Sequence, residues 1–185
     1  MYEDRHQLIA LTGRKGSGKD TAAQVLVADG YANVKFAAIL KEMISGYLIY
    51  IGVPKEEMAR MIEGDLKEQP MDIFGGKTTR HVMQTLGTEW GREMVWTDIW
   101  TNAFKLRAKK YPLVVCTDMR FPSEVETINA LGGFKVRVVR DMPTSSEGSE
   151  HISEAHIDAL KVDVEVKNDS SIAALQARLR ALSFR

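Results

Sequence analysis

The stretch TGRKGSGKDTAAQVL, residues 12–26, decides the fold that we expect. Gly13, Gly18 and Lys19 satisfy the pattern G-x-x-x-x-G-K of a loop that binds phosphate groups. The apolar run QLIAL at 7–11 precedes the loop and predicts a buried strand, and apolar residues at helical spacing follow it. In that context glycines let backbone N–H groups and a helix N-terminus converge on phosphate oxygens. The stretch therefore predicts nucleoside triphosphate binding.

The residue that follows the lysine sets this loop apart. Loops of this pattern usually carry Ser or Thr there, whose hydroxyl binds Mg²⁺, whereas this chain carries Asp20. A carboxylate is a suitable ligand for this hard cation, directly or through water. Alternatively, Asp20 is only an acidic residue in the first turn of a helix, where the partial positive charge favours it. With ATP and Mg²⁺ as the expected ligands, the phosphate-binding set comprises Gly13, Arg14, Lys15, Gly16, Ser17, Gly18, Lys19, Asp20 and Thr21.

Apolar runs alternate with helical patterns along the rest of the chain. Further strands are expected at 34–36, within 111–117, at 134–140 and at 162–166, and helices between 122 and 131 and at 170–182. Strands that alternate with helices are typical of a parallel sheet. The predicted fold is therefore an α/β P-loop NTPase fold of three layers, α/β/α, with a parallel central sheet.

One interval interrupts this alternation. Residues 37–111 contain no convincing strand and show helical patterns near 38–51, 54–63, 79–94 and 97–110. An excursion of this size predicts a helical insert that binds substrate, on a single domain whose core comprises about 6–36 and 112–185. The turn-forming residues within about 141–155 predict a mobile loop that acts as a lid.

Composition excludes several classes of partner. The chain has 25 Lys and Arg against 25 Asp and Glu, so no overall field holds nucleic acid or an anionic membrane. The charged N-terminus lacks the apolar core of a signal peptide, and the run at 44–53 is too short to span a bilayer. We therefore expect a cytoplasmic protein with small-molecule ligands. The single Cys116 has no disulfide partner, which indicates a buried thiol.

A second polar group follows the apolar run LVVCT at 113–117. Asp118 stands at the carboxyl end of that predicted strand, where ligands of open α/β sheets bind. Its carboxylate could orient Mg²⁺-bound water, accept a hydrogen bond from a nucleotide, or only begin a turn. Arg120 and Glu124 could form a substrate clamp, or a local ion pair with no role in binding.

Four segments in this order carry a family resemblance: GRKGSGKDT at 13–21, TTRHVMQTLGTEWGR at 78–92, TDMRFPSEVE at 117–126 and HISE at 151–154. Over nearly its whole length, the chain resembles the phage-type deoxynucleoside monophosphate kinases. The resemblance implies transfer of a phosphoryl group from ATP to a deoxynucleoside monophosphate, in the host cytoplasm if a phage encodes the protein. It leaves a homodimer open.

The resemblance also assigns roles to individual residues. It implies catalytic roles for Lys19, Asp20, Asp118 and Arg120, and substrate contacts for Arg80, Gly87, Thr88, Arg92, Trp100, Asp118, Arg120 and Glu124. Trp100 matches the tryptophan that contacts the base, and Trp90 and Trp96 lie close to it in the sequence. One departure is His81, which replaces a second cation and puts its role as a phosphate ligand in doubt.

Phosphoryl transfer relies on positioning and on compensation of negative charge, so arginines and lysines should converge on the site. The candidates are Arg14 or Lys15, Arg80, Arg92, Arg120, and Arg137 or Arg140, each of which could instead be a solvated surface residue. Two alternatives remain. One is another small-molecule P-loop kinase, similar to phosphomevalonate or dephospho-coenzyme A kinases, which the segments at 78–92 and 117–126 oppose. The other is a regulatory module that binds ATP without catalysis.

Overall fold

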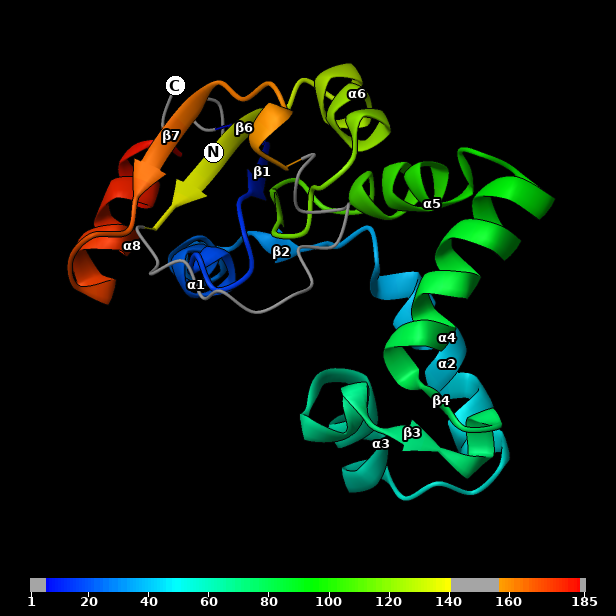
Figure 1. Ribbon diagram of the computed structural model, residues 1–185. Helices are drawn as coiled ribbons and strands as arrows, with labels where there is room; N and C mark the ends of the chain where they lie inside the picture. Colours follow the sequence, from blue (N-terminus) through cyan, green and yellow to red (C-terminus); the bar gives the residue numbers. More distant parts are fainter. Residues whose placement is uncertain (1–5, 141–156, 184–185) are drawn as a thin grey trace. The chain divides into compact units, whose positions relative to one another are not determined.

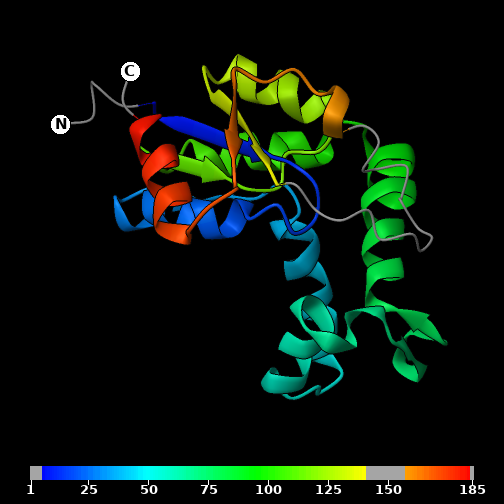
Figure 2. The same cartoon turned by 60° about the vertical axis from the view of Figure 1, so that its left-hand side comes forward.

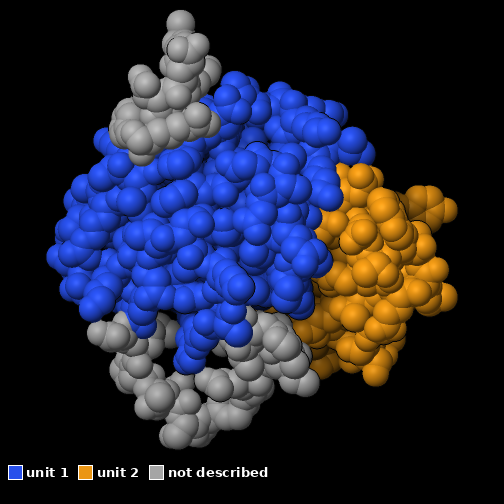
Figure 3. All heavy atoms as spheres, turned by 90° about the horizontal axis from the view of Figure 1, so that it is seen from above, with its two compact units in different colours: residues 1–36, 104–185 blue, residues 37–103 orange. Residues whose placement is uncertain are grey.

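The computed structural model describes residues 6–140 and 157–183 of the 185-residue chain. The described residues form two compact units (Figure 3). The first comprises the chain up to Phe36 and from Phe104 onward, and the second comprises Ala37–Ala103. The loop expected to act as a lid, 141–155, lies outside the described residues. No helix in the described ranges is long and apolar enough to cross a membrane.

A five-stranded sheet forms the centre of the first unit. Its strands are β1 (Leu8–Thr12), β2 (Ala32–Asn33), β5 (Val114–Cys116), β6 (Phe134–Val139) and β7 (Val164–Lys167). They run in the order β2-β5-β1-β6-β7 and every neighbouring pair is parallel (Figure 1). The central strand β1 is buried along its whole length and leads into the glycine-rich loop. The prediction of a parallel central sheet is confirmed.

Helices cover both faces of this sheet, as Figures 1 and 2 show. The helices are α1 (Lys19–Ala28), α5 (Ile99–Ala108), α6 (Pro122–Ala130) and α8 (Ile172–Ala181). Along β1, Ile9 and Leu11 pack with α1 and α8, whereas Leu8 and Ala10 pack with the end of α5 and with α6. This alternation follows from the two-residue period of a strand, and it gives the predicted three layers.

The second strand lies earlier than the sequence predicted. Strand β2 covers Ala32–Asn33 rather than 34–36. The backbone N–H of Val34 still donates to the carbonyl of Val115, but the backbone N–H of Phe36 donates to Asp118 Oδ1 at 3.0 Å. The Phe36 ring stacks on Phe104 with centroids 4.0 Å apart. The Asp118 side chain therefore replaces a backbone acceptor of β5, and the pairing of β2 with β5 ends there.

The second unit is mostly helical and has its own core. It contains α2 (Ala38–Tyr50), α3 (Lys55–Glu63), η1 (Asp65–Glu68), η2 (Asp72–Phe74), α4 (Thr79–Thr85), η3 (Leu86–Val95) and the start of α5, coloured cyan to green in Figure 1. Ile44, Leu48, Met61 and Ile62 are buried together at its centre. The expected helical character is present, and η3 is a π-helix rather than a continuation of α4.

Two details of the predicted insert differ from the structure. A short antiparallel hairpin, β3 (Pro70–Met71) with β4 (Lys77–Thr78), lies where no strand was expected. Gly75 and Gly76 close it with φ values of 60° and 78°, a conformation that favours glycine. The unit also ends at Ala103 rather than at 111, because the next apolar residues, Phe104 and Ala108, are buried in the core of the first unit.

Candidate functional site

The loop between β1 and α1 is shaped by its glycines. Gly13, Gly16 and Gly18 have φ values of 141°, 79° and 97°, which L side chains rarely adopt. A Cβ on Gly13 would lie 2.4 Å from the backbone carbonyl oxygen of Val138, so that position also lacks space for a side chain. The sequence pattern of the loop therefore reflects backbone geometry that only glycine provides.

Two polar groups of the loop are placed for an anionic ligand. Lys19 Nζ donates to the carbonyl oxygens of Gly13, at 2.7 Å, and Arg14, at 2.9 Å, so the ammonium group lies against the loop backbone. Ser17 Oγ is buried and has no hydrogen-bond partner among the described residues. Buried hydroxyls without a partner are uncommon, and a phosphate oxygen would satisfy this one.

The C-terminal part of the chain supports the loop and extends the site. Asn168 Nδ2 donates to the Ser17 carbonyl at 2.9 Å, and Gln176 Nε2 donates to the Thr21 carbonyl at 3.0 Å. A cavity of about 440 Å³ lies here, lined by Gly16, Gly18, Lys19, Asp20, Thr21, Arg140, Asn168, Ser170, Ile172 and Leu175. Its polar loop wall and partly apolar far wall suit a small polar ligand. A hollow of about 570 Å³ along β7 and α8 includes no loop residue.

Asp20 accepts hydrogen bonds from two residues that follow the neighbouring strands β2 and β5. Its Oδ1 accepts hydrogen bonds from Lys35 Nζ at 2.6 Å and from Thr117 Oγ1 at 2.7 Å. Burial alone would raise the pKa of Asp20, but these hydrogen bonds and the charges of Lys35 and Lys19 outweigh it and lower the pKa below its usual value. The carboxylate is therefore ionised near neutral pH, and Oδ2 has no hydrogen-bond partner among the described residues.

The donor set fits a magnesium ion that a nucleotide brings with it. The described residues contain no group of three or more His, Cys, Asp or Glu side chains that could hold a metal by themselves. Mg²⁺ usually binds to one or two carboxylates together with phosphate oxygens and water, and does not need a full protein cage. Asp20, with one uncommitted oxygen beside the loop, suits that role.

The polar residues after β5 make different contacts from one another. Asp118 Oδ1 accepts from the Phe36 N–H and, at 3.3 Å, from the Cys116 thiol. Glu124 Oε2 accepts from the backbone N–H groups of Arg120, at 2.7 Å, and Phe121, at 3.2 Å, so it caps α6. Arg120 is an exposed residue, and it forms no ion pair with any described residue. The local ion pair between Arg120 and Glu124, one alternative from the sequence, is therefore absent from the described contacts.

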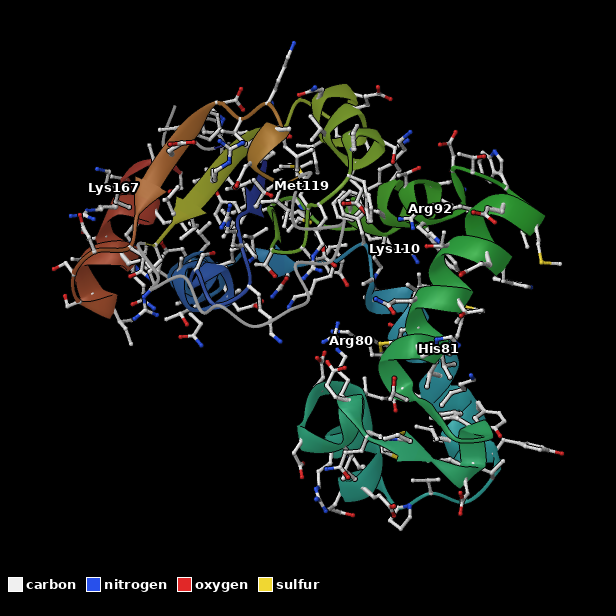
Figure 4. The ribbon with its side chains drawn as sticks, in the orientation of Figure 1. Arg80, His81, Arg92, Lys110, Met119 and Lys167 are labelled. Atoms are coloured by element: carbon white, nitrogen blue, oxygen red, sulfur yellow. The ribbon has the colours of Figure 1, made fainter. Side chains whose placement is uncertain are left out.

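Cationic candidates of the second unit lie on α4 and η3. Figure 4 labels Arg80 and His81 at the start of α4 and Arg92 on η3. Arg80 forms an ion pair with Glu68, and Arg92 donates to the Gly87 carbonyl at 3.3 Å. Thr88 is exposed on η3. These residues share one helical segment, and their roles as substrate contacts stay predictions.

Trp100 is a packing residue of the second unit. Its side chain is 3% exposed, and its indole N–H donates to the Gly87 carbonyl at 2.7 Å. Gly91 lies directly against the ring, because a Cβ there would be 2.3 Å from Trp100 Cζ2. Trp90 and Trp96, at 38% and 51% exposed, have surface available to a ligand. The assignment of base contact to Trp100 stays a prediction that this packing does not favour.

Comparison with protein families places the chain. Residues 66–179, more than half of the sequence, match the family described as deoxynucleotide monophosphate kinase. The chain belongs to this family. The resemblance seen in the sequence is thereby confirmed, and the matched range contains η3 and the segment after β5.

Individual relatives agree with the family match. The chain is 29% identical over 187 residues to a putative deoxynucleotide monophosphate kinase of Acanthamoeba polyphaga mimivirus, with 93% of each chain covered. It is 27% identical over 157 residues to the deoxynucleotide monophosphate kinase of Escherichia phage RB69, covering 82% of this chain and 60% of the phage protein.

Solved structures share the fold at low identity. TT1252 from Thermus thermophilus is similar at 18% identity and a TM-score of 0.54, with 96% of both chains covered. Shikimate kinase from Bacteroides thetaiotaomicron has 15% identity and a TM-score of 0.53, covering 95% of this chain and 97% of its own. Dephospho-CoA kinase from Campylobacter jejuni has 11% identity and a TM-score of 0.52, with 95% of both covered. The predicted three-layer α/β/α fold with a parallel central sheet is confirmed.

Sequence reasoning missed four residues that organise the site: Lys35, Thr117, Asn168 and Gln176. Three of them follow, or lie at, strand ends on the same edge of the sheet as the loop. Because the carboxyl ends of parallel strands share one edge, polar residues near the end of each strand were the available signal, but the predicted strands at 34–36 and within 111–117 included Lys35 and Thr117 themselves. Gln176 lies within α8 and gave no such signal.

Proposed function

We propose that the protein transfers the γ-phosphoryl group of ATP to a deoxynucleoside monophosphate and so produces the diphosphate. The observation that carries this proposal is the glycine-shaped loop with Lys19 on the wall of the 440 Å³ cavity, in a chain of this kinase family. The loop and the cavity lie within one unit, so the donor half of the proposal does not depend on the second unit.

The donor residues divide between phosphates and base. Lys19 would exchange its contacts with the Gly13 and Arg14 carbonyls for phosphate oxygens, and Ser17 Oγ would gain a partner. The segment 168–175, with Ile172 and Leu175 in the cavity wall, offers apolar surface to a base. Mg²⁺, when bound with the nucleotide, would neutralise charge on the phosphates, and Asp20 would hold it directly or through water.

The acceptor residues follow from the family resemblance. In the second unit, Arg80, Thr88 and Arg92 would contact the deoxynucleoside monophosphate, and Trp90 and Trp96 join Trp100 as candidates for contact with its base. In the first unit, the exposed Arg120 would bind phosphate. Asp118 would orient Mg²⁺-bound water or accept a hydrogen bond from the nucleotide. Transfer needs little covalent work from the protein, so these groups contribute positioning and charge compensation.

A product assay tests the proposal. The chain is incubated with Mg-ATP and, separately, dAMP, dGMP, dCMP, dTMP or modified pyrimidine monophosphates, with ribonucleotides and dephospho-coenzyme A as comparison acceptors. Diphosphate products are separated by anion-exchange chromatography, and ADP is measured with and without acceptor. We expect at least one deoxynucleoside diphosphate to form in step with ADP. If no deoxynucleoside monophosphate is phosphorylated and ADP stays at the rate without acceptor, the proposal fails.

A further inference from the structure

The contact between Asp20 and Thr117 reverses a familiar arrangement. In most P-loop enzymes a hydroxyl on the loop and an acid at the end of a neighbouring strand share the Mg²⁺ site. Here the acid, Asp20, lies in the first turn of α1 directly after the loop, and the hydroxyl, Thr117, follows the neighbouring strand β5. The two groups are joined by a 2.7 Å hydrogen bond, so both are present with their positions exchanged.

The contact fixes which oxygen of Asp20 is available. Thr117 Oγ1 and Lys35 Nζ both bind Oδ1, and Oδ2 is left without a hydrogen bond from a described residue. Thr117 is 2% exposed, which restricts its side chain, whereas the Asp20 side chain is 68% exposed. A buried and ordered donor therefore orients an exposed carboxylate.

The neighbouring acid is engaged elsewhere. Successive side chains at a strand end point to opposite sides, and Asp118 Oδ1 accepts from the Phe36 N–H and the Cys116 thiol instead. Among the described residues of the first unit, Asp20 is thus the carboxylate to which the Thr117 hydroxyl donates. This division of labour separates the two acids that the sequence placed in one site.

We propose that Thr117 is a positioning residue that presents Asp20 Oδ2 to the Mg²⁺ of the bound nucleotide, with the acid and hydroxyl exchanged between loop and strand. The proposal rests on the proposed function, because it assumes that the loop binds Mg-ATP. It assigns a role to a threonine that matches no part of the loop pattern.

The test measures binding, without turnover. The affinity of the purified chain for the non-hydrolysable analogue AMPPNP is measured by calorimetry over a series of Mg²⁺ concentrations and in EDTA. Thr117→Val removes the hydroxyl at nearly constant volume, and Thr117→Ser retains it as the matched control. We expect the Val variant to need about tenfold more Mg²⁺, or more, for half of the Mg²⁺-dependent gain in affinity, because partners that orient metal ligands contribute this much. The Ser variant should resemble the wild type, and affinity in EDTA should be alike in all three.

A double variant separates positioning from a merely structural contact. Asp20→Thr should lose the Mg²⁺ dependence, and the exchange Asp20→Thr with Thr117→Asp should regain part of it by restoring the usual arrangement. An unchanged Mg²⁺ requirement in Thr117→Val, with the wild-type dependence intact, overturns the inference and leaves the proposed function standing. If the wild type binds AMPPNP in a Mg²⁺-dependent way but phosphorylates no acceptor, the proposed function fails instead.

Discussion

Gly91 offers a quantitative test of how the second unit is packed. A Cβ at this position would lie 2.3 Å from Cζ2, 2.6 Å from Cε2 and 2.7 Å from Nε1 of Trp100. The ring cannot move away easily, because it is 3% exposed and its N–H is bonded to Gly87. Overpacking of this kind costs about 1–3 kcal/mol, and the higher helix propensity of alanine offsets up to about 1 kcal/mol. Gly91→Ala should therefore lower the free energy of unfolding by about 1–2 kcal/mol.

The chain supplies both the assay and the control. Its three tryptophans are residues 90, 96 and 100, so tryptophan fluorescence during urea unfolding reports on the second unit. With a slope of about 2 kcal/mol per molar urea, the midpoint should fall by about 0.5–1 M. Gly87→Ala is the matched control, because its Cβ would meet only the Leu40 methyl group at 3.2 Å, which a flexible side chain can relieve. Equal urea midpoints for Gly91→Ala and the wild type would refute the close packing of Gly91 against Trp100. A larger fall of the midpoint in Gly87→Ala than in Gly91→Ala would refute it as well.

Three further predictions concern the first unit. Gly13→Ala should abolish AMPPNP binding in calorimetry, because its Cβ would lie 2.4 Å from the Val138 carbonyl at a φ of 141°; retained binding would contradict this loop geometry. Asn168→Ala removes the 2.9 Å hydrogen bond to the Ser17 carbonyl, so AMPPNP affinity should fall by about threefold to tenfold, consistent with about 1 kcal/mol for such a bond. Burial raises the pKa of the Cys116 thiol well above its usual value, so at pH 8 the folded chain should react with iodoacetamide far more slowly than the urea-unfolded chain. Equal alkylation rates in the folded and unfolded chains would show that the thiol is accessible. Because the Cys116 pKa is higher in the folded chain, raising the pH above the ordinary thiol pKa should also favour the unfolded state.

The sequence predicted the fold well where local patterns and tertiary packing agree. Apolar runs predicted the parallel strands, and the loop pattern predicted a glycine-shaped turn between β1 and α1, because positive φ at Gly16 and Gly18 is a local requirement. Prediction failed where a distant side chain decides the outcome. Strand β2 ends early because Asp118 captures the Phe36 N–H, and no local pattern contains that contact. For Trp100, the close approach of Gly91 shows that the ring packs inside the second unit, which no local pattern contains, and its contact with a base stays a prediction.

The structure also changes how Asp20 should be understood. A bare carboxylate beside a triphosphate is repelled by it, and the sequence left open whether Asp20 binds a cation or only stabilises a helix end. Lys35 lies 2.6 Å from Oδ1 and compensates the charge in the absence of nucleotide, so the acid stays ionised without a metal. A residue that only favoured the helix N-terminus would need neither this lysine nor the buried hydroxyl of Thr117. Lys35 and Thr117 both donate to the same oxygen, so they fix the orientation of the carboxylate more than a helix end requires. A fixed orientation is what a metal ligand needs.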